Sequence, residues 1–305
     1  MVPGRRWLSK RMGNLEIDED LVRSLVREQH PDLAGLDLRE VDGGWSNQMW
    51  RLGDELAVRM PRTPDAPTFV RKEHQWMPVL TPRLPLPVPT IVRIGEPSER
   101  FPWPWTITAW VPGEPADRAS ITRGEHAADS LAGFLRVLHQ HAPAEAPADL
   151  DHGGPLKALT RGFEQWIHLV NGTGDHLREV WEDAVSAPDW QGPSTWVHGD
   201  LHPANVVTVD GTLAGIIDFG ALCAGDPASD LAAAWLLLPS GADTRFLTAY
   251  ADTDEAMIRR ARGWAILRGL MLISIGRAGD RGLPGGKKTW GPAGRSTIDR
   301  VLASI

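Results

Sequence analysis

Residues 196–207 read WVHGDLHPANVV, and residues 215–220 read GIIDFG. Inside the first stretch, a histidine, an aspartate, a second histidine and an asparagine are gathered in a short polar run between the apolar strings STWV and VVTV. Short apolar strings bounded by polar residues are typical of buried strands. We therefore expect the polar run to be a loop between two strands and to bind something charged.

The oxygen atoms of this stretch indicate a magnesium-nucleotide site. Asp200 and Asn205 lie five residues apart in the loop after the strand TWV, and Asp218 ends the strand LAGII. Carboxylate and amide oxygens are the hard ligands that Mg²⁺ prefers, and Mg²⁺ commonly completes its shell with water and phosphate oxygens. The set therefore favours binding of a metal-nucleotide.

The same residues allow two other interpretations. His198, Asp200 and His202 form H-x-D-x-H, which could hold zinc in a hydrolase. Pro203 follows directly and the sequence has no further cluster of cysteine and histidine, so we disfavour zinc. The second interpretation, ordinary polar loop residues with His198 as a core histidine, explains that histidine but not the joint spacing.

The pattern of predicted secondary structure changes near residue 113. Before it, strand patterns surround one helix pattern, and after it amphipathic helix patterns dominate. The strand patterns cover 38–60, 90–95 and 105–111, the first helix 68–80, and the later helices the regions around 160–171, 175–186, 227–238 and 255–276. We predict an α+β fold of two lobes, a small antiparallel-sheet lobe at 1–112 and a larger, mainly helical lobe at 113–305. Residues 1–14 are expected to be a disordered extension.

The block WVHGDLHPANVV followed by GIIDFG resembles the catalytic and metal-binding loops of the aminoglycoside phosphotransferase family, small-molecule kinases related in fold to protein kinases. GGWSNQMWRLGDELAVRMPR resembles the family's phosphate-covering hairpin, VRKEHQWMPVL its N-lobe helix and ITAWVPGE its hinge between the lobes. The resemblance covers most of residues 38–240 and implies a protein-kinase-like fold.

The resemblance also implies roles for the residues of the opening motifs. Asp200 would orient the acceptor hydroxyl and accept its proton, while Asn205 and Asp218 would hold Mg²⁺ against the nucleotide phosphates. His198 would support the loop backbone. For His202 the resemblance implies no particular role.

Five residues of the first lobe are expected to bind ATP or GTP by the same resemblance. The hydroxyl of Ser46 would cover the phosphates, Arg59 with its partner Glu73 would contact them, and Ala109 and Val111 would meet the adenine edge through backbone groups. Arg59 stands where many relatives have lysine. Either Arg59 contacts the phosphates in an active enzyme, which we favour, or nucleotide binding is weakened. Alternatively, Arg59 and Glu73 form only a surface salt bridge that contributes little.

The implied activity is transfer of the γ-phosphate to a hydroxyl of a small molecule. We expect an antibiotic acceptor, with aminoglycosides first and macrolides or cationic peptides next. A metabolic amino alcohol or sugar is the rival acceptor, and a non-catalytic nucleotide-binding protein is the rival class. Residues 145–189 hold nine acids against three bases, which would attract a cationic acceptor or merely face solvent.

The amino-acid composition limits the classes of partner and the cellular location that we expect. The net charge is -7, and the excess of acid lies wholly in residues 113–305, with 24 Asp and Glu against 17 Lys and Arg, which disfavours nucleic acid as a partner. The sequence has one cysteine and no apolar run long enough to span a membrane. A cytoplasmic protein without a membrane partner is expected.

Overall fold

The computed structural model describes residues 16–41, 43, 46–63, 65–170 and 172–305. The extension expected at residues 1–14 lies outside the described residues. The described residues divide into two compact units: the first comprises those of Met1–Pro82 and Val88–Val111, and the second comprises those of Arg83–Pro87 and Pro112–Ile305. The chain therefore passes between the units more than once.

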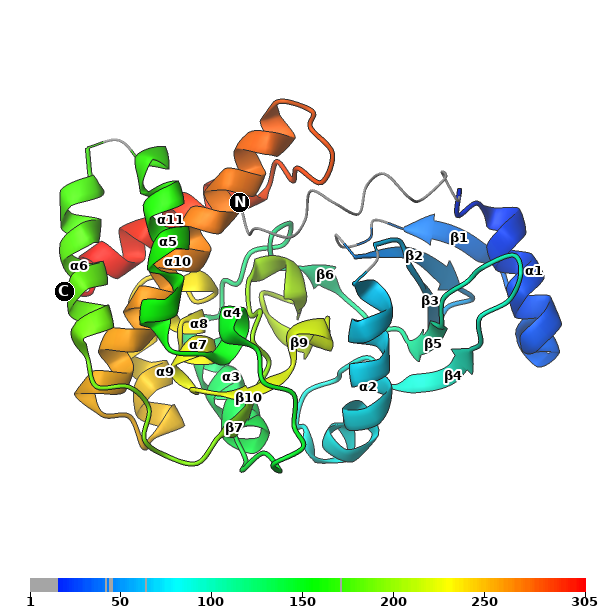
Figure 1. Cartoon of the computed structure of the whole chain (residues 1–305), viewed down its shortest axis with the longest axis horizontal. Helices are drawn as coiled ribbons and strands as arrows, with labels where there is room; N and C mark the ends of the chain where they lie inside the picture. The colour runs from blue at the N-terminus through cyan, green and yellow to red at the C-terminus, as the bar shows by residue number, and fades with distance from the viewer. Residues whose placement is uncertain (1–15, 42, 44–45, 64, 171) are drawn as a thin grey trace. The chain divides into compact units, whose positions relative to one another are not determined.

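The first unit is built on a five-stranded antiparallel sheet (Figure 1). Its strands follow the order β1-β2-β3-β5-β4. They are β1 (Leu38–Val41), β2 (Asn47–Leu52), β3 (Leu56–Pro61), β4 (Ile91–Gly95) and β5 (Trp105–Ala109), and the helices of this unit are α1 (Glu19–Gln29) and α2 (Ala66–Leu80). The expected strands and the helix at 68–80 are confirmed.

Helix α1 packs on this sheet through one apolar face. Val22 and Leu25 belong to the same buried cluster as Trp50, Val58 and Trp105 of the strands. The helix begins where the side chain of Asp18 accepts a hydrogen bond from the backbone N–H of Leu21, at 2.8 Å. Such a cap satisfies one of the N–H groups that the first helical turn leaves without a partner.

The second unit is mainly helical and carries two small sheets. One sheet has the order β6-β8-β9 and the other pairs β10 with β7. The strands are β6 (Glu114–Pro115), β7 (Thr195–Val197), β8 (Val206–Val209), β9 (Thr212–Ile216) and β10 (Cys223–Gly225). The helices are α3 (Gly124–Leu138), α4 (Leu150–Gly153), α5 (Thr160–Trp166), α6 (Gly174–Ser186), α7 (Ala228–Leu231), α8 (Ala233–Leu236), α9 (Asp243–Tyr250), α10 (Glu255–Asp280) and α11 (Trp290–Ala303). The expected α+β class is confirmed.

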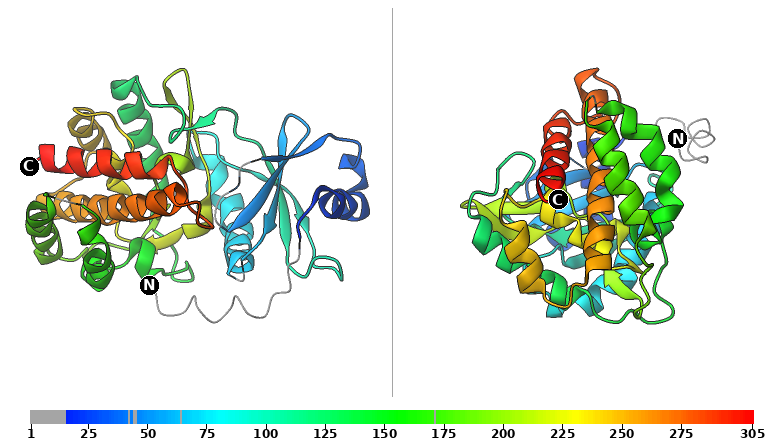
Figure 2. Two further views of the ribbon diagram at one scale, coloured as in Figure 1. Left: turned by 90° about the horizontal axis from the view of Figure 1, so that it is seen from above. Right: turned by 90° about the vertical axis from the view of Figure 1, so that its left-hand side faces the viewer.

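Helices α10 and α11 run side by side (Figure 2) because glycines let their backbones approach closely. A Cβ atom added to Gly294 would lie 2.4 Å from the carbonyl oxygen of Gly269, and one added to Gly276 would lie 2.3 Å from the backbone nitrogen of Gly291. Both separations are shorter than a carbon can tolerate. The pair therefore forms a tightly packed scaffold within the second unit.

Within the described part of the chain, no helix combines the length and the apolar character needed to cross a membrane.

Candidate functional site

The loop that carries Asp200 begins at the end of β7 and depends on a glycine. Gly199 has a φ of 81°, in the left-handed region. A Cβ atom at this position would also lie 2.8 Å from the carbonyl oxygen of Ala221. Any side chain here would be strained and crowded at once. Glycine between His198 and Asp200 therefore allows the chain to turn sharply just before the aspartate.

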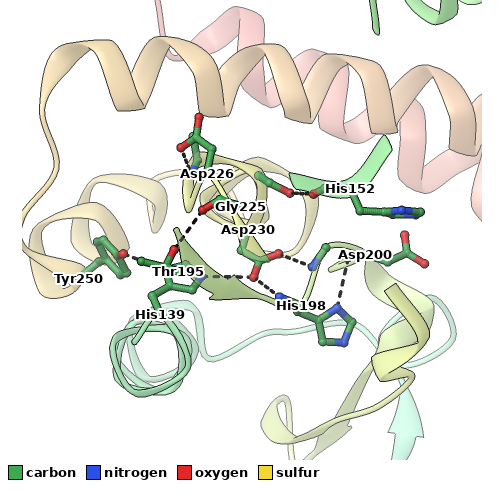
Figure 3. A network of polar contacts seen from close by, with 12 residues as sticks. His139, His152, Thr195, His198, Asp200, Gly225, Asp226, Asp230 and Tyr250 are labelled. Atoms are coloured by element: carbon green, nitrogen blue, oxygen red, sulfur yellow. Dashed lines mark hydrogen bonds and ion pairs between the residues drawn. The ribbon is translucent and has the colours of Figure 1, made fainter. Parts of the chain in front are cut away.

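Asp230 of α7 holds the amide groups of this turn (Figure 3). Its two carboxylate oxygens accept hydrogen bonds from the backbone N–H groups of His198, at 2.6 Å, and Gly199, at 2.9 Å. Burial alone would raise the pKa of Asp230, but its hydrogen bond with His139 and the nearby guanidinium of Arg268 hold the pKa below its usual range. The carboxylate therefore remains a charged anchor for the loop backbone.

Arg268 of α10 holds the carbonyl side of the same turn. Its guanidinium donates to the carbonyl oxygen of Gly199 at 2.6 Å and to the hydroxyl of Ser229 at 2.7 Å. The residue is buried, and burial lowers its pKa from the usual value. Because hydrogen bonds involving charged groups are the stronger ones, the Gly199 peptide is fixed from both sides. Sequence reasoning missed Arg268, since it lies in a helix 68 residues after Asp200 and no local pattern marks it.

His198 lies at the centre of this support and is fully buried. Its Nδ1 accepts a hydrogen bond from the N–H of Asp200 at 3.2 Å, and its Nε2 lies 3.1 Å from the carbonyl oxygen of Ile217, to which it donates. Burial lowers the pKa of His198, which favours the neutral ring that this pair of bonds requires. The side chain thereby connects the Asp200 loop to the strand that leads to Asp218.

Asp200 itself presents a charged and reachable carboxylate. Its side chain is 30% exposed, and Oδ2 lies 3.6 Å from Nε2 of His202. Burial works to raise the pKa of this carboxyl, but its interactions with His202, His152 and Arg268 outweigh burial and hold the pKa well below the usual range. A carboxylate of this kind can accept a hydrogen bond from a hydroxyl and orient it.

Asn205 and Asp218 lie at the same end of the β8–β9 hairpin. Val206 pairs with Ile216, and the N–H of Ile217 donates to the carbonyl oxygen of Asn205 at 2.9 Å. The amide nitrogen of Asn205 donates to the backbone oxygen of Asp200 at 2.9 Å, so that amide is oriented by the Asp200 loop. The structure thus brings Asp200, Asn205 and Asp218 into one region of the second unit.

The donor atoms of this region fit Mg²⁺. Asp218 has a left-handed backbone, with φ 64° and ψ 73°, and its Oδ1 accepts from the N–H of Gly220 at 3.3 Å. Mg²⁺ is commonly held by one or two protein oxygens, with substrate phosphates and water completing the octahedron. One carboxylate and one amide oxygen meet that requirement. Among the residues that the structure describes, no three His, Cys, Asp or Glu side chains are grouped as a metal site.

His202, for which the sequence suggested no role, is buried beside Asp200. Its Nδ1 accepts from the N–H of Ala204 at 3.3 Å, which caps the short 3₁₀ turn Pro203–Asn205. Its ring meets the ring of Trp290, at the start of α11, with centroids 4.6 Å apart and the planes at 60°. The glycine-rich stretch 279–297 therefore includes the first turns of a helix packed against the Asp200 loop.

The expected nucleotide residues of the first unit occupy its sheet and α2. Arg59 of β3 and Glu73 of α2 form an ion pair of 2.6 Å, with side chains 9% and 5% exposed. The pair is therefore buried, and the alternative of a surface salt bridge is excluded. The backbone oxygen of Ser46 accepts from the N–H of Arg62 at 2.9 Å, just before β2.

Ala109 and Val111 lie at and just beyond the end of β5. The N–H of Trp110, between them, donates to the carbonyl oxygen of Glu55 at 2.7 Å. Since the peptide groups of an extended chain alternate in direction, the groups of Ala109 and Val111 point to the opposite side from that bond. The N–H of Ala109 donates there to the carbonyl oxygen of Thr90 at 2.8 Å.

Known proteins resemble this chain at the level of the family. The sequence model described as the phosphotransferase enzyme family matches residues 37–270, well over half of the chain. An aminoglycoside 3'-phosphotransferase of Escherichia coli is 27% identical over 159 residues, covering 49% of this chain and 57% of that protein. A homoserine kinase of Granulibacter bethesdensis is 29% identical over 173 residues, covering 49% of this chain and 50% of that protein. The chain thus spans about half the length of the curated relatives it matches.

Solved structures show the same fold. The GDP and kanamycin complex of APH(2")-IIia matches with a TM-score of 0.70 at 20% identity, covering 93% of this chain and 98% of that one. The apoenzyme of a macrolide 2'-phosphotransferase from Brachybacterium faecium matches with a TM-score of 0.60 at 22% identity, covering 90% of this chain and 97% of that one. The expected kinase-like fold is confirmed.

Proposed function

The chain belongs to the phosphotransferase enzyme family, and we propose that it transfers the γ-phosphate of ATP or GTP to a hydroxyl group of a small molecule. The observation that carries this proposal is the grouping of Asp200, Asn205 and Asp218 around one hairpin end, with the Asp200 loop fixed by Asp230 and Arg268. Positioning and charge neutralisation supply most of the catalysis in phosphoryl transfer, and this arrangement provides both.

Each group has a defined part in the proposed reaction. Asp200 orients the acceptor hydroxyl and takes its proton as the oxygen attacks the γ-phosphorus, while the bond from the γ-phosphorus to the bridging oxygen breaks and ADP or GDP leaves. Asn205 and Asp218 hold Mg²⁺, which when bound neutralises the charge of the nucleotide phosphates. In the first unit, Ser46 and Arg59 contact the phosphates, and Glu73 holds the Arg59 guanidinium in place.

Val111 and Ala109 complete the proposed nucleotide contacts through backbone groups that meet the purine edge. Backbone recognition does not depend on the side chain, so it leaves ATP and GTP both open. A competition measurement with the two nucleotides decides between them.

Asp218→Asn is expected to abolish magnesium-dependent nucleotide binding while leaving the fold intact.

The acceptor that we propose is an aminoglycoside or a macrolide antibiotic. Support comes from relatives and structural neighbours with those names. The similarity to a homoserine kinase favours, as a second candidate, a metabolic amino alcohol with the same chemistry. Magnesium-dependent ADP or GDP release with kanamycin, a macrolide and homoserine as acceptors separates the two. A protein that binds nucleotide but shows no acceptor-stimulated release would instead be a binding protein.

A further inference from the structure

His152 of α4 lies directly over the Asp200 loop, in a position that neither the motifs nor the comparisons assign. A Cβ atom added to Gly199 would lie 3.0 Å from Cβ of His152. His152 is also close enough to Asp200 to influence the pKa of its carboxyl. Figure 3 shows the imidazole of His152 and the carboxylate of Asp200 on the same side of the loop. The two side chains are therefore neighbours, although 48 residues separate them in sequence.

The segment that carries His152 is anchored to the core of the second unit. The carbonyl oxygen of His152 accepts a hydrogen bond from the hydroxyl of Ser229, and the carbonyl oxygen of Gly153 accepts from the N–H of Asp226 at 3.0 Å. A Cβ atom on Gly153 would lie 3.0 Å from Sγ of Cys223, which shows how closely the segment packs. His152 is thus held on a rigid support, as a residue that contacts a substrate needs to be.

Asp149 lies beside one nitrogen of the imidazole. Its Oδ2 lies 3.0 Å from Nδ1 of His152, and the side chains of His152 and Asp149 are 33% and 28% exposed. Because Nδ1 faces a carboxylate, Nε2 is the ring nitrogen that can meet a ligand. An imidazole nitrogen and the Asp200 carboxylate therefore lie close together.

We infer that His152 contacts the acceptor and that the preferred acceptor carries a second hydrogen-bond donor next to the hydroxyl that is phosphorylated. This inference rests on the proposed function. Asp200 accepts from the reacting hydroxyl, and Nε2 of His152 accepts from a neighbouring hydroxyl or amine, as in a vicinal diol or an amino alcohol. A site with two such acceptors rejects a compound that lacks one donor, because a polar group loses its partner.

The first test is steady-state kinetics of His152→Ala with kanamycin, or with whichever of kanamycin, a macrolide and homoserine gives the highest turnover. We expect kcat/KM for the acceptor to fall about 10-fold to 200-fold, the loss associated with one substrate contact. The KM of the nucleotide is expected to stay unchanged. His152→Gln, whose amide can still accept a hydrogen bond, should recover part of the loss, whereas a purely structural role predicts no such recovery.

His168→Ala is the matched control, because this histidine is exposed and lies in the 3₁₀ turn Ile167–Leu169. It should leave both constants unchanged. The second test uses analogues of the acceptor that lack the hydroxyl or amine next to the phosphorylated position. The effect of His152→Ala should vanish on the analogue that lacks the correct donor.

The outcomes separate the inference from the proposed function. If the wild-type protein phosphorylates an acceptor and His152→Ala leaves its kcat/KM unchanged, the inference is wrong and the proposed function stands. An increase in the nucleotide KM without a change in the acceptor KM would also overturn it. If the wild-type protein releases no ADP or GDP with any acceptor, the proposed function fails, and the inference fails with it.

Discussion

Asp200 combines a partly exposed side chain with a strongly lowered pKa. Substitution by asparagine removes the proton acceptor but keeps the size of the side chain. We expect Asp200→Asn to lower kcat by about 10²-fold to 10⁴-fold, the usual contribution of a positioned general base. Nucleotide affinity, measured by titration calorimetry with Mg²⁺ present, should change little.

Asp210→Asn is a suitable control for this variant. Asp210 is exposed in the β8–β9 turn and has a φ of 50°, a conformation that asparagine adopts readily. Its turnover should equal that of the wild-type protein. Near-normal turnover of Asp200→Asn would show that the base has been wrongly assigned.

The buried pair of Arg59 and Glu73 gives a second prediction for single residues. Arg59→Met removes the positive charge that faces the buried Glu73 carboxylate, so we expect the free energy of unfolding to fall by about 3–5 kcal/mol. The double variant Arg59→Met with Glu73→Leu removes both charges and should recover most of that stability. Urea unfolding measures both changes, and nucleotide titration of the double variant then tests whether Arg59 contacts phosphate.

The site residues that could be predicted from the sequence are those that lie in short, recognisable motifs. Asp200, Asn205 and Asp218 lie in two short motifs, so their chemistry and spacing could be recognised without a structure. Arg268 and His152 carry no such signature. Each meets the Asp200 loop only after folding, and a lone arginine or histidine in a helix has too many ordinary explanations to single it out.

At the scale of helices and strands, the α10–α11 contact depends on glycine for its close approach. Gly294→Ala would place a methyl group 2.4 Å from the oxygen of Gly269, so we expect a loss of at least about 2 kcal/mol of unfolding free energy. Gly133 lies inside α3, and among the described residues no atom beyond its own helix and chain neighbours comes within 4 Å of the place that a Cβ would take. Gly133→Ala should therefore stabilise by about 0.5–1 kcal/mol. Thermal or urea unfolding compares the two variants, and equal effects would contradict the role of Gly294 in packing.

The strands and the longer helices could be predicted because their apolar periodicity is local. The order β1-β2-β3-β5-β4 and the backbone contact between α10 and α11 could not, since both depend on partners distant in sequence. The stretch 279–297 illustrates the difference. A high glycine content is typical of a mobile loop, whereas here Gly291 and Gly294 serve close helix packing and Trp290 packs on His202.

For the whole molecule, buried His198 and Asp230 predict how stability depends on pH. The pKa of His198 is lowered in the folded protein, so the unfolded chain binds a proton first as the pH falls below about 6.5. The pKa of Asp230 is also lowered, so its stabilisation is present above about pH 3.9 and is lost as the pH falls through the folded value. Both groups therefore make the protein less stable in acid.

Urea unfolding between pH 7.5 and pH 5 tests the first of these effects. One histidine contributes a slope that approaches about 1.4 kcal/mol per pH unit below its unfolded pKa. His198→Gln lacks the titrating ring and should show a shallower slope over this range than the wild-type protein. An unchanged slope would mean that other groups cause the acid sensitivity.

The central claim, that this chain is a small-molecule phosphotransferase with Asp200 as its base, is tested most directly by acceptor-stimulated nucleotide turnover. The measurement is magnesium-dependent ADP or GDP release by the purified protein with aminoglycoside, macrolide and amino alcohol acceptors, for the wild-type protein and Asp200→Asn. We expect release that at least one acceptor stimulates and that the variant loses. Nucleotide binding without stimulation by any acceptor, or stimulation that survives in Asp200→Asn, would contradict the claim.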